Sequence, residues 1–136
     1  MANEMKIELR QVSASASEAT IGAHCVLIDR PASKGGADAG PMGGELFLAS
    51  VGGCFMSNLL AAMKARESKI SGVRTEVTAT LDGTPARFVA LELCVTVDST
   101  NGEPLEKLVE IAERGCIMIN TLRGKLELKV RIGAPV

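Results

Sequence analysis

The chain has 136 residues, the size of one ordinary domain, and we expect one domain over residues 1–136. Hydrophobic residues make up 46% of it, but only three are Phe and none are Trp or Tyr. The chain therefore lacks the aromatic faces on which single-stranded nucleic acid stacks. The net charge is −1 and the 15 Lys and Arg are scattered, so we expect no nucleic-acid partner.

The N-terminal segment, MANEMKIELRQ, carries charges of both signs and has no apolar stretch of the kind found in signal peptides. We therefore expect a cytoplasmic protein. In a reducing cytosol, its four cysteines are expected to be free thiols, ligands or redox groups, and not a structural disulfide framework.

The N-terminal part of the chain predicts two weak strands, at residues 5–12 and 24–29. A turn region of small residues, 13–17, joins them. Residues 29–44, DRPASKGGADAGPMGG, contain enough Gly, Pro and Ala to predict a flexible connection.

A long helix is predicted from about Gly44 to Glu67. Residues 46–63 are uncharged, which is close to the shortest length that spans a membrane. Ser, Asn and Gly interrupt this stretch, so we expect a buried core helix and no membrane association.

The C-terminal half predicts a hairpin from two alternating strands, 73–81 and 88–97, and a last strand at 126–132. Charges on the second face of these strands indicate a sheet that is packed on one side only. A helix begins at Pro104 and is expected to end at Gly115. We expect i,i+4 ion pairs on it, namely Glu103–Lys107 and Glu110–Arg114. Together these elements predict an α+β protein.

A long helix that is apolar on all sides needs more cover than a one-sided sheet and one short amphipathic helix can give. A second copy of the chain would supply this cover. The apolar surplus therefore predicts a homodimer with the long helices at its centre.

Cys54 lies in the long helix directly after Gly52-Gly53, on the same helix face as Ser50 and Asn58. A break of the helix at the glycines would put Cys54 near a new N-terminus, where the helix dipole favours a thiolate. A buried, unreactive core cysteine is the other interpretation. Spacing alone leaves both open.

Cys116 follows Gly115, just past the second helix, where we expect an exposed side chain. The fold alone could bring it to Cys54, because a disulfide needs Cα atoms within about 7 Å.

The other candidate sites are weaker. We expect Cys25 and Cys94 to fill space within strands. No Cys-x-x-Cys is present and His24 is the only histidine, which predicts no zinc site and makes a Cys–His protease remote. Residues 34–45 lack the Gly-Lys-Ser/Thr ending of a phosphate-binding loop. We expect neither a metal nor a cofactor.

Two segments resemble the OsmC/Ohr family of osmotically inducible and organic-hydroperoxide-resistance proteins. They are GGADAGPMGGELFLASVGGCFMSNLLAA around Cys54 and AERGCIMINTLRG around Cys116. The resemblance implies an OsmC-like intertwined homodimer, in which antiparallel sheets wrap long apolar central helices.

The resemblance also implies a thiol-dependent peroxidase for small hydrophobic hydroperoxides. Cys54 would attack the peroxide and become a sulfenic acid, and Cys116 would condense with it to a disulfide. A dithiol reductant, lipoyl-type in this family, would reopen the disulfide.

The chain departs from the family's best-known peroxidases at three places. Gly44 stands where they carry a glutamate, and Ile117 stands where proline is common. The turn at 13–18 lacks their arginine, and Arg10 and Arg30 are the nearest substitutes. These departures keep two alternatives open: a non-catalytic protein that binds a small hydrophobic ligand between subunits, and a structural dimer with inert cysteines.

Overall fold

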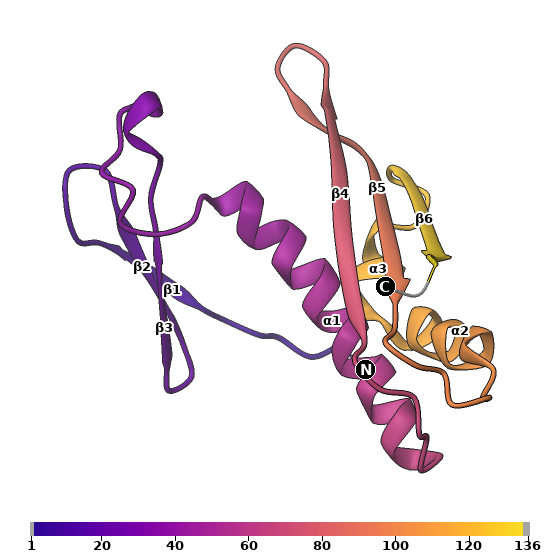
Figure 1. Ribbon diagram of the computed structural model, residues 1–136. Coiled ribbons are helices and arrows are strands. Elements are labelled where there is room, and N and C mark those ends of the chain that lie inside the picture. Colours follow the sequence, from indigo (N-terminus) through magenta and orange to yellow (C-terminus); the bar gives the residue numbers. More distant parts are fainter. Residues whose placement is uncertain (1, 135–136) are drawn as a thin grey trace. The chain divides into compact units, whose positions relative to one another are not determined.

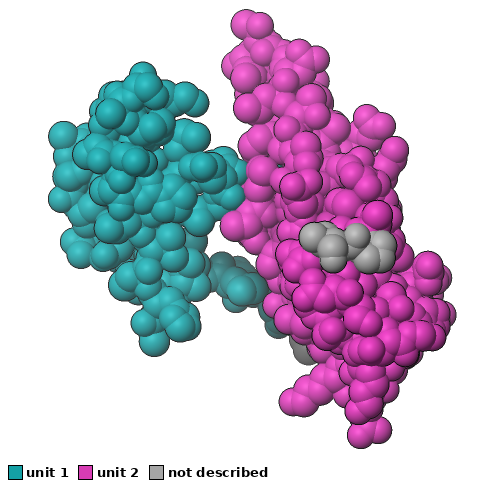
Figure 2. Space-filling model, viewed as in Figure 1, with its two compact units in different colours: residues 1–47 teal, residues 48–136 magenta. Residues whose placement is uncertain are grey.

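The computed structural model describes residues 2–134 and confirms the α+β class (Figure 1). The elements in chain order are β1 (Glu8–Gln11), β2 (Ser17–Ile21), β3 (His24–Ile28), the 3-10 helix η1 (Ala32–Lys34), α1 (Gly43–Ala65), β4 (Arg74–Asp82), β5 (Arg87–Thr96), α2 (Leu105–Gly115), α3 (Ile117–Leu122) and β6 (Glu127–Ile132). The chain divides into two compact units, residues 1–47 and 48–136, which are coloured separately in Figure 2. Each unit is described by itself.

The first unit contains an antiparallel sheet in the order β1-β2-β3. The predicted turn at 13–17 is present, closed by the Val12 N–H on the Ala16 carbonyl at 3.0 Å. β1 is shorter than the predicted strand at 5–12. β2 begins at Ser17, where the expected turn ends. We assigned no strand to these residues, because their sequence, SEATI, is too short to show a clear alternation of apolar and polar residues.

The loop between β3 and α1 is more regular than the flexible connection that its composition predicts. The buried Asp29 carboxylate accepts N–H groups from Arg30 at 2.7 Å and from Ala37 and Ala39 at 3.1 Å each. The hydrogen bond from Ala39 is the main cause that lowers the pKa of Asp29. Burial raises this pKa, but hydrogen bonds from Arg30, the Ser15 side chain and Ala37 lower it further. The carboxylate of Asp29 therefore holds the loop in a defined conformation. The amino-acid composition of the loop could not indicate this role of a single residue.

α1 has the length that we expected, within two residues at each end. One stripe of it is buried in this chain, comprising Val51, Gly52, Phe55, Leu59 and Ala62. By length and composition alone α1 could cross a membrane, and 28% of its apolar window is buried. Core helices of water-soluble proteins meet the same criteria, so this is a weak indication of a membrane span. Leu60 is 50% exposed and marks the uncovered side of α1.

The second unit contains a sheet in the order β4-β5-β6. β4 and β5 form the predicted antiparallel hairpin, with an irregularity between Thr80 and Leu81. β6 pairs parallel to β5, which differs from the expectation of wholly antiparallel sheets. The connection between the two strands explains this, because α2 and α3 lie between β5 and β6 in the chain. A connection of this length can bring the chain back to the end of the sheet at which β5 began, so that β6 runs parallel to β5.

α2 has the predicted apolar stripe, and α3 was not predicted. Glu110 and Arg114 form the expected ion pair at 2.8 Å. Glu103 lies before α2 and does not pair with Lys107 among residues 2–134; it instead accepts the Ser68 hydroxyl at 2.6 Å and the Lys69 N–H at 2.8 Å.

We expect Phe55→Ala to lower the free energy of unfolding by about 3–5 kcal/mol, because it leaves a large cavity in the second unit. Phe55 is completely buried on α1. Leu81→Ala is the control, since Leu81 is 62% exposed and its truncation opens no cavity. Urea unfolding followed by circular dichroism measures both, and equal losses would contradict the assigned core.

Candidate functional site

Cys54 lies near the middle of α1 and is half-buried. The helix continues through Gly52 and Gly53, so the break that one of the two interpretations of Cys54 required is not present. A Cβ atom at Gly52 would lie only 2.8 Å from Val77 Cγ2, whereas one at Gly53 would meet nothing within 4 Å. The first glycine therefore allows α1 to approach β4 closely, and the pair does not end the helix.

Cys116 lies in the elbow, a name we use for residues 115–118, where α2 ends and α3 begins. Its side chain is fully buried, so the expected exposed position is wrong. No pattern in the sequence indicated α3, which follows Cys116 directly. Ile117, the next residue, is 71% exposed.

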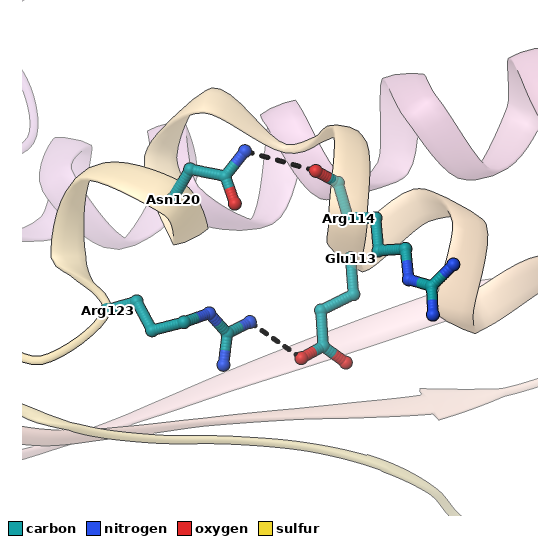
Figure 3. A network of polar contacts seen from close by, with 4 residues as sticks. All are labelled: Glu113, Arg114, Asn120 and Arg123. Carbon is teal, nitrogen blue, oxygen red and sulfur yellow. Dashed lines mark hydrogen bonds and ion pairs between the residues drawn. The ribbon is translucent and has the colours of Figure 1, made fainter.

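Polar contacts fix the elbow on the side shown in Figure 3. Asn120 Nδ2 donates to the Arg114 carbonyl at 3.1 Å, and Arg123 forms an ion pair with Glu113 at 2.8 Å. Both contacts join α2 to α3 or to the residue just after it. They restrain the backbone turn that carries the buried thiol.

The structure brings Cys54 and Cys116 together. Burial raises the pKa of Cys54, but hydrogen bonds to its sulfur from the Met118 N–H, the Cys116 thiol and the Ile117 N–H outweigh burial and lower the pKa below its ordinary value. The hydrogen-bond donors to the Cys54 sulfur therefore come from the elbow, and not from the N-terminus of a broken helix. No arginine contributes to this lowering of the pKa among residues 2–134.

The Cys116 thiol has the opposite tendency. Burial raises its pKa most, and the hydrogen bond to Cys54 and the negative charge of Cys54 raise it further, whereas N–H groups of Ile119 and Met118 act against this. As the pH rises, the half-buried Cys54 therefore loses its proton before the buried Cys116. Such a pair can provide an attacking thiol and, beside it, a thiol that condenses with the oxidised sulfur.

The remaining cysteines lie elsewhere. Cys25 is exposed on β3, so it does not fill the core as we expected. Cys94 is half-buried on β5, beside Glu76 and Arg131 in the sheet register, on the polar face that its sequence predicted. Among residues 2–134 no group of three or more His, Cys, Asp or Glu side chains could hold a metal ion.

Two of the three positions at which the chain departs from the family peroxidases, Gly44 and the turn at 13–18, lie in the first unit, and Ile117 lies in the second. Arg10 pairs with Glu18 at 2.9 Å. Arg30 forms no ion pair within residues 2–134 and lines a hollow of about 460 Å³ together with Ser15 and Gly44. Lys34 lines the same hollow and likewise forms no ion pair within residues 2–134, whereas Arg10 is paired.

We expect the alkylation of Cys54 by iodoacetamide to show an inflection below the free-thiol value of about 8.5, because only the thiolate reacts and its pKa is lowered. The rate should be low below that inflection and level off above it. Cys116→Ala removes one donor and should move the inflection up, whereas Cys94→Ala should leave it in place. Peptide mass mapping assigns the site, and an unchanged inflection in Cys116→Ala would contradict the role of that donor.

A sequence model of the family described as "OsmC-like protein" matches residues 35–131. No curated protein sequence matches the chain. Solved structures share the fold, including an OsmC-like protein from Mycoplasma pneumoniae, with a TM-score of 0.82, 18% identity and 100% of both chains covered.

Two other similar structures carry a functional name. One is an organic hydroperoxide resistance protein OsmC from Legionella pneumophila, with a TM-score of 0.73, 20% identity, and 98% of this chain and 100% of that chain covered. The other is the organic hydroperoxide resistance protein OhrB of Bacillus subtilis, with a TM-score of 0.67, 22% identity, and 94% and 96% covered. At these identities the likeness establishes the fold.

Proposed function

Because the chain belongs to the family of OsmC-like proteins, we propose that it is a thiol-dependent peroxidase that reduces organic hydroperoxides. The single observation that carries this proposal is the contact between two thiols of unequal acidity, Cys54 and Cys116. The names of the similar Legionella and Bacillus structures support the choice of organic hydroperoxides as substrates.

In the proposed reaction, the Cys54 thiolate attacks the terminal oxygen of the hydroperoxide and the O–O bond breaks. Sulfur is oxidised to a sulfenic acid, and the peroxide leaves as an alkoxide that takes a proton to become an alcohol. The Cys116 thiol then displaces water from the sulfenic acid to give a Cys54–Cys116 disulfide. A dithiol reductant, of the lipoyl type, restores both thiols by exchange.

We also infer that the working form is a cytoplasmic homodimer. The exposed apolar side of α1 supports this, since a second copy could cover it.

The test is to add one equivalent of cumene hydroperoxide to the fully reduced protein and to record its intact mass. The proposal expects the loss of two hydrogens and a new disulfide between the Cys54 and Cys116 peptides. An unchanged mass, with both thiols still open to alkylation after denaturation, would remove the enzyme interpretation. A retained apolar ligand in native mass spectrometry would then favour the carrier.

A further inference from the structure

Asn58 lies one helical turn after Cys54 on the same face of α1, and both side chains are half-buried. Side chains at i and i+4 of a helix have Cβ atoms about 5–6 Å apart. The amide of Asn58 is therefore within reach of a small group that is bound at the Cys54 sulfur.

The elbow crosses α1 beside both residues. A Cβ atom at Gly115 would lie 3.7 Å from Asn58 Nδ2 and 3.8 Å from its Cγ, and the next residue, Cys116, contacts the Cys54 sulfur. Because position 115 has no side chain, nothing from that residue covers the amide. The amide and the two sulfurs thus lie together within the second unit.

The amide of Asn58 has hydrogen-bonding capacity to spare. It forms no hydrogen bond with any other residue in 2–134, whereas Asn120 on α3 donates from its amide to the Arg114 carbonyl. Because Asn58 is half-buried, its amide is open to a molecule that enters from solvent. An uncommitted donor next to a reactive sulfur points to a ligand as its partner.

From this geometry we propose that Asn58 is a catalytic residue whose amide donates a hydrogen bond to the leaving oxygen of the peroxide. This inference rests on the proposed function. As the Cys54 thiolate forms the S–O bond, the O–O bond breaks and negative charge develops on the oxygen that carries the organic group. A fixed N–H donor stabilises that charge more in the transition state than in the intact peroxide.

The test compares Asn58→Leu, which removes the donor at similar volume, with Ser57→Ala, an exposed neighbour on another face of α1. The reaction of reduced protein with cumene hydroperoxide is followed by rapid quenching and mass spectrometry. We expect Asn58→Leu to slow this reaction by about 10- to 100-fold, and Ser57→Ala to leave it within twofold of the unsubstituted protein. Asn58→Asp, which keeps the shape of the side chain, should be slowed at least as much.

Two further measurements separate catalysis from a structural role. The pH profile of Cys54 alkylation by iodoacetamide should be the same in Asn58→Leu and the unsubstituted protein, because that reaction has no oxygen leaving group. The penalty in Asn58→Leu should also be larger for cumene hydroperoxide than for perbenzoic acid, whose carboxylate leaves without help.

Cumene hydroperoxide rates in both Asn58 variants within twofold of the unsubstituted protein would overturn the inference. Equal penalties for the two oxidants, or a parallel loss of alkylation, would overturn it as well. If the unsubstituted protein reacts with iodoacetamide but with neither oxidant, the proposed function itself fails. These two failures are therefore distinguishable.

Discussion

Replacing Cys54 with serine is expected to lower the rate of hydroperoxide reduction by about 10³-fold or more, because the hydroxyl remains protonated and cannot attack the O–O bond. The lowered pKa of Cys54 and its partial exposure are the reasons for choosing it as the attacking thiol. Consumption of cumene hydroperoxide with a dithiol reductant present measures the effect.

Cys116→Ala should have a different outcome. The first oxidation should persist, but Cys54 should then gain one oxygen and, with excess peroxide, further oxygens, because no thiol is present to trap the sulfenic acid. Cys25→Ser and Cys94→Ser are the matched controls and should still lose two hydrogens. If Cys54→Ser retains full turnover, or if Cys116→Ala still forms an internal disulfide, the assignment of the two roles is wrong.

Leu60→Lys is expected to convert the inferred dimer to a monomer. Leu60 is an exposed apolar residue on α1, and burial of an unpaired ammonium group in an apolar interface is costly. A central interface residue contributes 2 kcal/mol or more, so the dissociation constant should rise at least about 30-fold. Light scattering over a dilution series measures it.

Leu81→Lys is the control, because Leu81 is also exposed but lies at the end of β4, outside α1. It should leave the mass in solution unchanged. A stable monomer in the unsubstituted protein at micromolar concentration would remove the dimer inference, and the exposed side of α1 would then need another explanation.

Period-two and helical patterns predicted the elements of the second unit well. The hairpin, α1, α2 and β6 all lie within a few residues of their expected bounds. Each of these segments buries one face, so the spacing of its apolar residues indicates which face packs against the core. The parallel pairing of β6 depends on the crossover and on register, which no local pattern records.

Of the candidate site, only the two cysteines could be predicted from the sequence. Cys54 and Cys116 could be chosen from the resemblance. Two of the three donors on Cys54, however, are the backbone N–H groups of Ile117 and Met118, and every residue type except proline can supply such a group. α3 was missed because its six residues, IMINTL, are too few for a helical period. The missing arginine of the turn at 13–18 suggested a Cys54 that is not activated, because backbone donors to its sulfur leave no trace in the sequence.

The dependence of the buried thiol on the charge of its neighbour has a consequence for timing. Burial raises the pKa of Cys116 most, and the charge of a Cys54 thiolate raises it further. Oxidation to a neutral sulfenic acid removes that charge, so the pKa of Cys116 should fall when a nucleophile is required. The oxidation of Cys54 by peroxide would thus activate Cys116 for disulfide formation. Before that oxidation Cys116 would stay protonated and unreactive.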